Sequence, residues 1–374
     1  MFKFECLYQS KRSAARIGRI HTPHGVIDTP HFVPVATQGT LKAIDSMHAS
    51  HLDMQLVFCN TYHLMLHPGA EVIAAAGGIH TFMGRSQPII TDSGGFQIFS
   101  LAYGGVTQEL KSKGTKQQHG SVLKITEEGV LFRSYRDGSK VLLTPERSIE
   151  AQKMIGADII IPLDELPPYH FDQYALHRSL ERTHRWEARS LAAHRSDQRG
   201  QAIYGVIHGG IDPVLRSISA QYLTTLPFDG FAIGGSLGKD HAEMERMLTM
   251  LCPQLPMHMP RHLLGMGDVR SLDIGIPLGI DTFDSAYPTR CARHGTLLTS
   301  RGVVKITKGI YRTVHTAIDP ECTCMVCVRH TAAYLHHLFK AYEPTAYTLA
   351  SIHNIQYMLT LFSRYRTAIA EDRL

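Results

Sequence analysis

Eight short apolar runs, each closed by a glycine or a polar residue, constrain the fold of this chain more than any other feature. They lie at residues 32–35, 56–60, 88–92, 159–164, 202–208, 230–234, 262–266 and 280–284. Runs that are apolar at successive positions are typical of strands buried on both faces, as in a parallel sheet. Helix-like stretches such as 145–156 and 173–193 separate most of them. The alternation predicts an α/β protein, and eight runs favour a closed (β/α)8 barrel over a doubly wound sheet.

Three segments depart from this repeat. The first thirty residues alternate and turn at His24-Gly25, so we expect a hairpin cap. Residues 103–143, with a polar stretch at 111–120, are too long for a connecting loop and predict a β excursion above the barrel mouth. Residues 305–353 carry a cysteine cluster and two helical stretches. We therefore predict a catalytic barrel over 1–304, a zinc-binding insertion over 305–353, and a C-terminal helix over 354–374 that packs back on the barrel.

Charge points to a phosphate-bearing partner. The net charge is +5, and residues 285–340 hold eight basic residues against two acidic ones. Such a local excess is typical of a surface that meets nucleic-acid phosphates. No run of about 18 apolar residues is present and the first residues do not form a signal peptide, so we expect a cytoplasmic protein with no membrane partner.

The cysteines indicate a metal rather than disulfides. The chain has seven, an odd number, and three of them fall within six residues. Cys322, Cys324 and Cys327 follow a C-x-C-x2-C pattern, which predicts structural zinc; a chance or redox cluster is the alternative. Four histidines are in reach as the fourth ligand, and spacing does not choose among them: His330, His336, His337 and His353.

Carboxylates close three of the apolar runs. They are Asp92, Asp164 and Asp284, and the last run carries Asp281 as well. One such aspartate is as readily a helix N-cap as a functional group. Strands of a barrel end at one mouth, however, and several carboxylates at one mouth suit glycosyl chemistry, in which one attacks or stabilises the anomeric carbon and another moves the proton.

Motifs spread over nearly the whole chain resemble those of the bacterial-type tRNA-guanine transglycosylases, also called queuine tRNA-ribosyltransferases. The motifs are Val35-Ala-Thr-Gln-Gly-Thr, Asn60-Thr-Tyr-His-Leu, Thr91-Asp-Ser-Gly-Gly-Phe-Gln, Asp137-Gly-Ser-Lys, Thr144-Pro-Glu-Arg-Ser, Ala232-Ile-Gly-Gly, Asp284 with Pro288-Thr-Arg, the cysteine cluster and His353-Asn-Ile. The resemblance implies a TIM barrel with a zinc subdomain. It also implies a glycosyltransferase of queuosine synthesis, which exchanges the wobble guanine of certain tRNAs for a 7-deazaguanine. The family further implies a homodimer.

The resemblance also implies a role for individual residues. Asp284 matches the nucleophile that forms a covalent aspartyl–RNA intermediate, and Asp92 matches the general acid/base. Arg290 and Arg293, which we expect in a basic loop, match positions beside the bound RNA. Residues that match the base pocket are Asp92, Ser93, Phe96, Asp164, His208, Gly234, Gly235, Gly238 and Leu264. The zinc ligands implied are Cys322, Cys324, Cys327 and His353.

The chain departs from the bacterial pattern at two pocket positions. His208 stands where a glutamine is usual, so its protonation would make the pocket sensitive to pH. Gly238 stands where valine is common, and we expect the missing side chain to leave room for queuine itself rather than the smaller 7-aminomethyl-7-deazaguanine. The alternative functions are a non-catalytic tRNA-binding or accessory subunit, an archaeal-type enzyme and, least of all, a zinc hydrolase.

Overall fold

Eight parallel strands close into a barrel. The computed structural model describes residues 2–102, 121–167 and 171–374. The sheet order is β4-β14-β13-β12-β11-β10-β6-β5, and a parallel bridge from Val35 to Phe58 joins its two ends. The expected (β/α)8 barrel is thus confirmed. Its strands are β4 (His31–Pro34), β5 (Val57–Cys59), β6 (Ile89–Thr91), β10 (Ile159–Ile160), β11 (Ala202–Ile207), β12 (Gly230–Ile233), β13 (Arg261–Leu263) and β14 (Thr282–Ser285).

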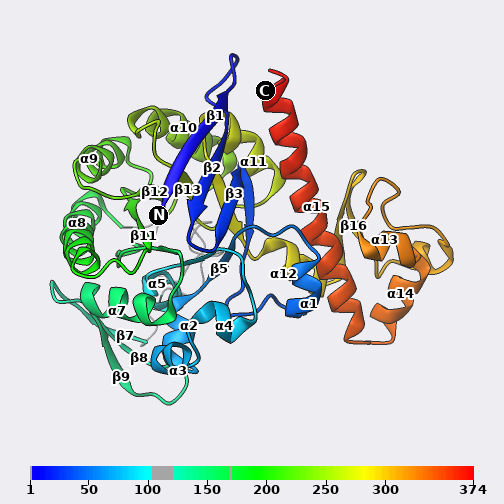
Figure 1. Cartoon of the computed structure of the whole chain (residues 1–374), viewed down its shortest axis with the longest axis horizontal. Helices are drawn as coiled ribbons and strands as arrows, with labels where there is room; N and C mark the ends of the chain where they lie inside the picture. The colour runs from blue at the N-terminus through cyan, green and yellow to red at the C-terminus, as the bar shows by residue number, and fades with distance from the viewer. Residues whose placement is uncertain (1, 103–120, 168–170) are drawn as a thin grey trace.

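Helices surround the barrel, and α8, α9 and α10 follow one side of it in Figure 1. None of the helices in the described ranges is long and apolar enough to span a membrane. The barrel helices are α1 (Ser46–Ser50), α2 (Thr61–Leu66), α3 (Ala70–Ala75), α4 (Ile79–Met83), α5 (Gly95–Ala102), α7 (Pro145–Ile155), α8 (Gln173–Arg195), α9 (Pro213–Leu223), α10 (His241–Leu251), α11 (Val269–Gly275) and α12 (Tyr287–Arg293), with 3-10 turns η1 (Cys252–Gln254) and η2 (Ile276–Leu278).

An antiparallel sheet covers the N-terminal end of the barrel. It consists of β1 (Lys3–Gln9), β2 (Arg16–Thr22) and β3 (Gly25–Thr29). The expected turn at His24-Gly25 joins β2 to β3 and is confirmed, while β1 adds a third strand. Ile20 and Ile27 of this sheet pack in one buried cluster with barrel residues such as Tyr204 and Val206. The sheet therefore seals the end of the barrel opposite the strands' carboxyl ends.

A buried ion pair joins this sheet to the barrel. Arg16 contacts both oxygens of Asp281, at 2.9 Å from Nε and 2.6 Å from Nη2, and both side chains are at most 1% exposed. Asp281 also accepts from the backbone N–H of Arg261 at 2.7 Å. Asp281 shares an apolar run with Asp284 but does not lie at the mouth, because it precedes β14 and faces the closed end. Its carboxylate is structural.

The predicted β excursion forms a three-stranded antiparallel sheet. Its strands are β7 (Val122–Ile125), β8 (Val130–Arg133) and β9 (Lys140–Leu143). Val122, Val130 and Phe132 pack in a cluster with Tyr62 of α2 and Trp186 of α8. Residues 122–143 of the predicted excursion are thus β structure, whereas residues 103–120, including the polar stretch at 111–120, lie outside the described residues.

The cysteine-bearing segment lies beside the barrel and joins it through one long helix. The segment contains β15 (Thr296–Thr299), β16 (Gly302–Lys305), η3 (Gly309–Thr313), α13 (Met325–Arg329), α14 (Ala332–Lys340) and the start of α15 (Thr345–Ala370). In Figure 1 α15 runs from this segment along the barrel to the N-terminal sheet. It packs against α12, β15 and β4. The boundary expected at residue 353 falls inside this continuous helix, and the domain limits stay predictions.

Removing one member of the buried ion pair tests its role in stability. In Asp281→Ala the guanidinium of Arg16 stays buried without its counter-ion, so we expect the free energy of unfolding in urea to fall by about 3–5 kcal/mol. The matched control is Glu371→Ala, because Glu371 pairs with Arg373 at a surface where both side chains are more than half exposed. We expect that control to change stability by less than about 0.5 kcal/mol. Equal effects would contradict the structural role.

Candidate active site and metal centre

Three carboxylates lie at the carboxyl ends of three barrel strands. Asp92 follows β6, Asp164 lies beyond β10, and Asp284 is the penultimate residue of β14. Their exposed fractions are 6%, 9% and 6%, so each is nearly buried without being sealed from solvent. Active sites of (β/α)8 barrels form at this face because the loops that follow the strands converge there. The fold therefore brings the three aspartates predicted from sequence to one mouth.

Asp92 is the most strongly held of the three. Its Oδ2 accepts from Asn60 Nδ2 and Gln97 Nε2, each at 2.7 Å, and its Oδ1 accepts from the Thr61 backbone N–H at 2.7 Å. Burial raises the pKa of Asp92 to about 6, although these donors stabilise its charged form and oppose the rise. A carboxyl that titrates near neutrality can both give and take a proton.

The donors to Asp92 were missed as functional residues. Asn60, Thr61 and Gln97 stand in quoted motifs, but no role was predicted for them. The signal was available, because Asn60 and Thr61 follow β5, the strand that pairs with β6, and Gln97 lies five residues after Asp92. Polar side chains that follow adjacent parallel strands meet at one edge of the sheet. This reasoning would have placed them beside Asp92.

Asp164 is engaged at both oxygens. Ser93 Oγ donates to its Oδ1 at 3.0 Å, which links the segment after β6 to the segment after β10. His208 Nε2 donates to its Oδ2 at 2.7 Å, and His208 is 2% exposed. The His208 Nδ1 atom is buried without a hydrogen-bond partner among the described residues. Two of the residues that match the base pocket, Asp164 and His208, are thus hydrogen-bonded to each other.

Side chains of α7 and α8 support the segment that carries Asp164. The strand was expected to extend over 159–164, but β10 ends at Ile160. The side chain of Gln152 replaces a neighbouring strand as the hydrogen-bond partner of the Ile161 backbone. Its Oε1 accepts from Ile161 N at 3.1 Å and its Nε2 donates to Ile161 O at 2.8 Å. Ser190 and Thr183 accept from the next N–H groups of the segment. The chain leaves the sheet early because these side chains satisfy its backbone.

Asp284 is held through one oxygen. Its Oδ1 accepts from the Gly265 backbone N–H at 2.8 Å and from His262 Nε2 at 3.1 Å. His262 lies on β13, is fully buried, and has Thr282 Oγ1 at 2.8 Å from its Nδ1. Sequence reasoning placed His262 in an apolar run and gave it no role. A histidine inside a strand that pairs with the strand of a candidate nucleophile was the signal that could have found it.

The predicted pocket glycines lie against His208 and the first turn of α10. At Gly234 a Cβ atom would approach Val206 Cγ1 to 2.7 Å and Leu264 Cδ1 to 3.3 Å, and at Gly235 (φ +75°) it would lie 3.0 Å from His208 Nδ1. At Gly238 (φ +124°) a Cβ atom would lie 2.4 Å from Glu243 Cβ. A side chain there would point at Glu243 of α10, and the expectation that its absence leaves room for a larger base stays a prediction. The part these residues play in binding stays a prediction.

The remaining predicted residues lie on the surface. Phe96, in the first turn of α5, is 40% exposed, as a stacking face requires. Arg290 and Arg293 are exposed, but they lie in α12 rather than in the expected loop. Because α12 begins two residues after β14, both arginines are on the element that leads away from Asp284. Whether they contact RNA stays a prediction.

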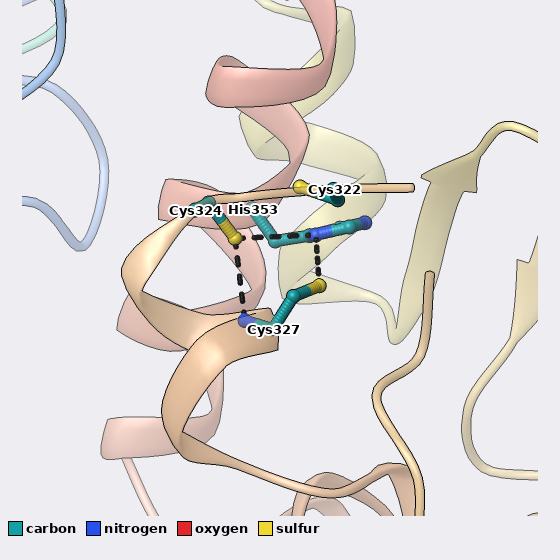
Figure 2. A group of neighbouring side chains, drawn as sticks. All are labelled: Cys322, Cys324, Cys327 and His353. Atoms are coloured by element: carbon teal, nitrogen blue, oxygen red, sulfur yellow. Dashed lines mark hydrogen bonds between the residues drawn. The ribbon is translucent and has the colours of Figure 1, made fainter. Parts of the chain in front are cut away.

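Three cysteines and a histidine form a four-ligand group between α13 and α15. Their ligand atoms all lie within 4.8 Å of one another, with Cys327 Sγ at 3.3 Å and Cys324 Sγ at 3.6 Å from His353 Nδ1. Figure 2 shows Cys322, Cys324 and Cys327 around the ring of His353. His353 Nε2 donates to Leu298 O at 2.8 Å, which leaves Nδ1 free to bind a metal. Geometry thus selects His353 from the four candidate histidines.

A second group of possible ligands is better explained by hydrogen bonds. His24 Nδ1 and His80 Nε2 each bond a separate oxygen of Asp158, at 2.8 and 3.0 Å. Burial raises the pKa of Asp158, but these bonds and one from Ile89 N outweigh it, and the pKa is lowered. The two rings stack at 3.6 Å and 13°, so their in-plane nitrogen lone pairs do not converge on one point. The group ties the β2–β3 turn to α4 and β10.

Comparisons with known proteins identify the class. A family profile described as queuine tRNA-ribosyltransferase matches residues 10–374. A queuine tRNA-ribosyltransferase of Protochlamydia amoebophila (strain UWE25) is 60% identical over 371 residues, which cover 99% of this chain and 96% of that protein. Those of Chlamydia abortus and Chlamydia trachomatis serovar L2 are 55% and 52% identical over 373 residues, with 100% of this chain and 99% of each relative covered.

The barrel, its carboxylates and its cysteine group define a glycosyl-transferring barrel enzyme with an attached metal subdomain. The match over nearly the whole chain makes the assignment specific: the chain belongs to the queuine tRNA-ribosyltransferase family.

Elemental analysis of purified protein tests the metal group. We expect about one metal ion per chain, because three thiolates and an imidazole make a complete tetrahedral set. His353→Ala removes one ligand, so we expect it to lose the metal and to lower the melting temperature. His337→Ala is the control, since His337 is an exposed histidine on α14, outside the group. Loss of metal in the control but not in His353→Ala would contradict the assignment.

Proposed function

We propose that this enzyme exchanges the wobble guanine of tRNA for a 7-deazaguanine through two displacements at the ribose C1′ atom. The observation that carries the proposal is the placement of Asp284 and Asp92 at one barrel mouth, in different surroundings. Asp284 has an oxygen that no hydrogen bond or ion pair of the described residues engages. Asp92 is buried and has a pKa of about 6. One carboxylate suits attack on carbon and the other suits proton transfer.

In the first displacement, a lone pair of Asp284 attacks C1′ and the bond from C1′ to the guanine nitrogen breaks. The bonding pair leaves on guanine, and Asp92 supplies the proton that neutralises it. An ester then joins Asp284 to the ribose. In the second displacement, the nitrogen of the incoming base attacks C1′, its proton passes to Asp92, and Asp284 departs as a carboxylate. Two inversions give net retention at C1′.

We further propose that Asp164 and His208 read the edge of the base. Their mutual hydrogen bond shows that both reach one point of the pocket, and Ser93 fixes the other oxygen of Asp164. A purine-like base would then displace the His208 contact and offer its own donors to Asp164. Gly234 and Gly235 admit the ligand close to the backbone, Leu264 borders Gly234, and Phe96 offers an exposed ring for stacking.

The nucleotide must leave its stack before C1′ reaches the mouth. Enzymes that act on a base in RNA therefore bind single-stranded loops and extrude the target. The exposed guanidinium groups of Arg290 and Arg293, on the helix after β14, support binding of the phosphates that flank such a nucleotide. We propose the anticodon loop of tRNA as the RNA partner and a 7-deazaguanine as the incoming base.

For the metal we propose zinc with a structural role. Cys322, Cys324, Cys327 and His353 would hold it, and their soft sulfur ligands fit Zn²⁺. With four protein ligands the metal has no open position for substrate, so it stabilises the subdomain and takes no part in the displacements.

The second function considered, a non-catalytic accessory subunit, is disfavoured because both candidate catalytic carboxylates are present at the mouth. We also propose a homodimer, as the resemblance to the family implies, and a location in the cytoplasm, which fits seven cysteines that form no disulfide.

Incorporation of labelled guanine into a tRNA transcript with a wobble guanine tests the proposal. We expect the wild-type chain to catalyse this exchange. Asp284→Asn removes the nucleophile, so we expect the rate to fall by about 1,000-fold or more while the melting temperature stays within a few degrees. Asp197→Asn is the control, because Asp197 is an exposed aspartate that pairs with Arg199. Full activity of Asp284→Asn would end the assignment.

The pH dependence tests the role of Asp92. Its ionised form must accept the proton of the incoming base, and this form is lost as pH falls through the raised pKa of about 6. We expect the second displacement to slow about tenfold per pH unit below that value. Asp92→Asn should leave a low rate that no longer falls below about pH 6 in this way, whereas His208→Gln should keep the fall of rate at acidic pH. If the fall of rate at acidic pH disappeared in His208→Gln and persisted in Asp92→Asn, the histidine and not Asp92 would be the titrating group.

A further inference from the structure

The surroundings of Asp284 treat its two oxygens differently. Oδ1 accepts from Gly265 N at 2.8 Å and from His262 Nε2 at 3.1 Å. Among the described residues, no hydrogen bond or ion pair reaches Oδ2. Asp284 lies near the carboxyl end of β14 and its side chain is 9% exposed, so the carboxylate lies at the open end of the barrel. One oxygen is fixed and the other is left to react.

His262 is itself held on three sides. Its Nδ1 lies 2.8 Å from Thr282 Oγ1, its Nε2 bonds Asp284, and its ring stacks at 15° on Phe58, with ring centroids 6.0 Å apart. It is fully buried and does not contact solvent. An ionised carboxylate only accepts hydrogen bonds, so Nε2 carries the proton that points at Asp284. In the neutral ring Nδ1 is then an acceptor, and the Thr282 hydroxyl donates to it.

We infer that His262 is a positioning residue for the nucleophile, a role that rests on the proposed function. With Gly265 it fixes Oδ1 through two donors, and the Thr282 hydroxyl holds the other ring nitrogen of His262. The rotation of the carboxylate is thereby restricted, and Oδ2 is presented to C1′. The same two donors stabilise the charge that returns to Asp284 when the ester breaks in the second displacement. His262 touches neither the base nor the reacting carbon.

Two amide variants separate this role from simple packing. In His262→Gln the side-chain amide can place an N–H where Nε2 stood, whereas in His262→Asn it reaches only the Nδ1 position. Both replace the ring by a polar side chain and both lose the contact with Phe58. We expect covalent RNA adduct formation to slow about 10- to 100-fold in His262→Asn, because a misplaced nucleophile loses orientation. In His262→Gln we expect a rate within about fivefold of wild type, on the same reasoning.

A second pair tests the anchoring of the ring without changing the histidine. Thr282→Val removes the hydroxyl and keeps the shape of the side chain, so Nδ1 loses its hydrogen-bond partner and the imidazole is held less firmly. Thr282→Ser keeps the hydroxyl. We expect the valine variant to show a reduced kcat with KM for tRNA unchanged, and the serine variant to restore kcat.

The measurement is adduct formation and guanine exchange with the same tRNA transcript, together with tRNA affinity and melting temperature for each variant. Equal rates for His262→Gln and His262→Asn, whether both normal or both reduced, would overturn the positioning role. A rise in KM with unchanged kcat would overturn it as well. If the wild-type chain exchanges no guanine, the proposed function is overturned. If the wild type exchanges guanine and the rates of His262→Asn and Thr282→Val equal the wild-type rate, only this inference is overturned.

Discussion

The rest of the structure depends on one constraint: a closed parallel barrel sends the carboxyl end of every strand to the same face. Asp92 and Asp284 are almost 200 positions apart in the sequence, and the topology of the barrel alone brings them to one mouth. The N-terminal sheet seals the opposite end, where the buried pair of Arg16 and Asp281 anchors it. The polar chemistry is thus confined to one side of an apolar interior. The topology of the barrel thus determines where the carboxylates lie.

Placing three nearly buried carboxylates together requires that each be stabilised separately. Burial penalises the charged form of a carboxylate unless hydrogen bonds compensate. Each aspartate has at least two donors, but the donors differ. Two amide groups and a backbone N–H donate to Asp92, whose pKa nevertheless stays raised. A hydroxyl and an imidazole engage the two oxygens of Asp164. Two donors hold a single oxygen of Asp284. This difference in surroundings, rather than in residue type, supports the separate roles proposed for them in proton transfer, base reading and nucleophilic attack.

The sequence predicted the elements well because buried parallel strands carry a strong pattern. All eight apolar runs are strands, and the three strands of the excursion and the long helix α8 lie where expected. Errors arose where tertiary contacts override local pattern. Gln152 ends β10 early, and Asp281 turns to the closed end because Arg16 lies there. Candidate site residues were predicted where motifs support them, whereas His262 was not, since its contact with Asp284 joins two neighbouring strands and leaves no signal in nearby sequence.

The central claim is that Asp284 bonds to the sugar, and the site of a covalent adduct tests it most directly. Wild-type enzyme would be mixed with a tRNA transcript bearing a wobble guanine, denatured, and digested with protease and nuclease for mass spectrometry. The structure predicts a nucleotide remnant on the peptide that contains Asp284, attached at that residue. Attachment at Asp92 or Asp164, or the absence of any denaturation-resistant adduct during active exchange, would contradict the account.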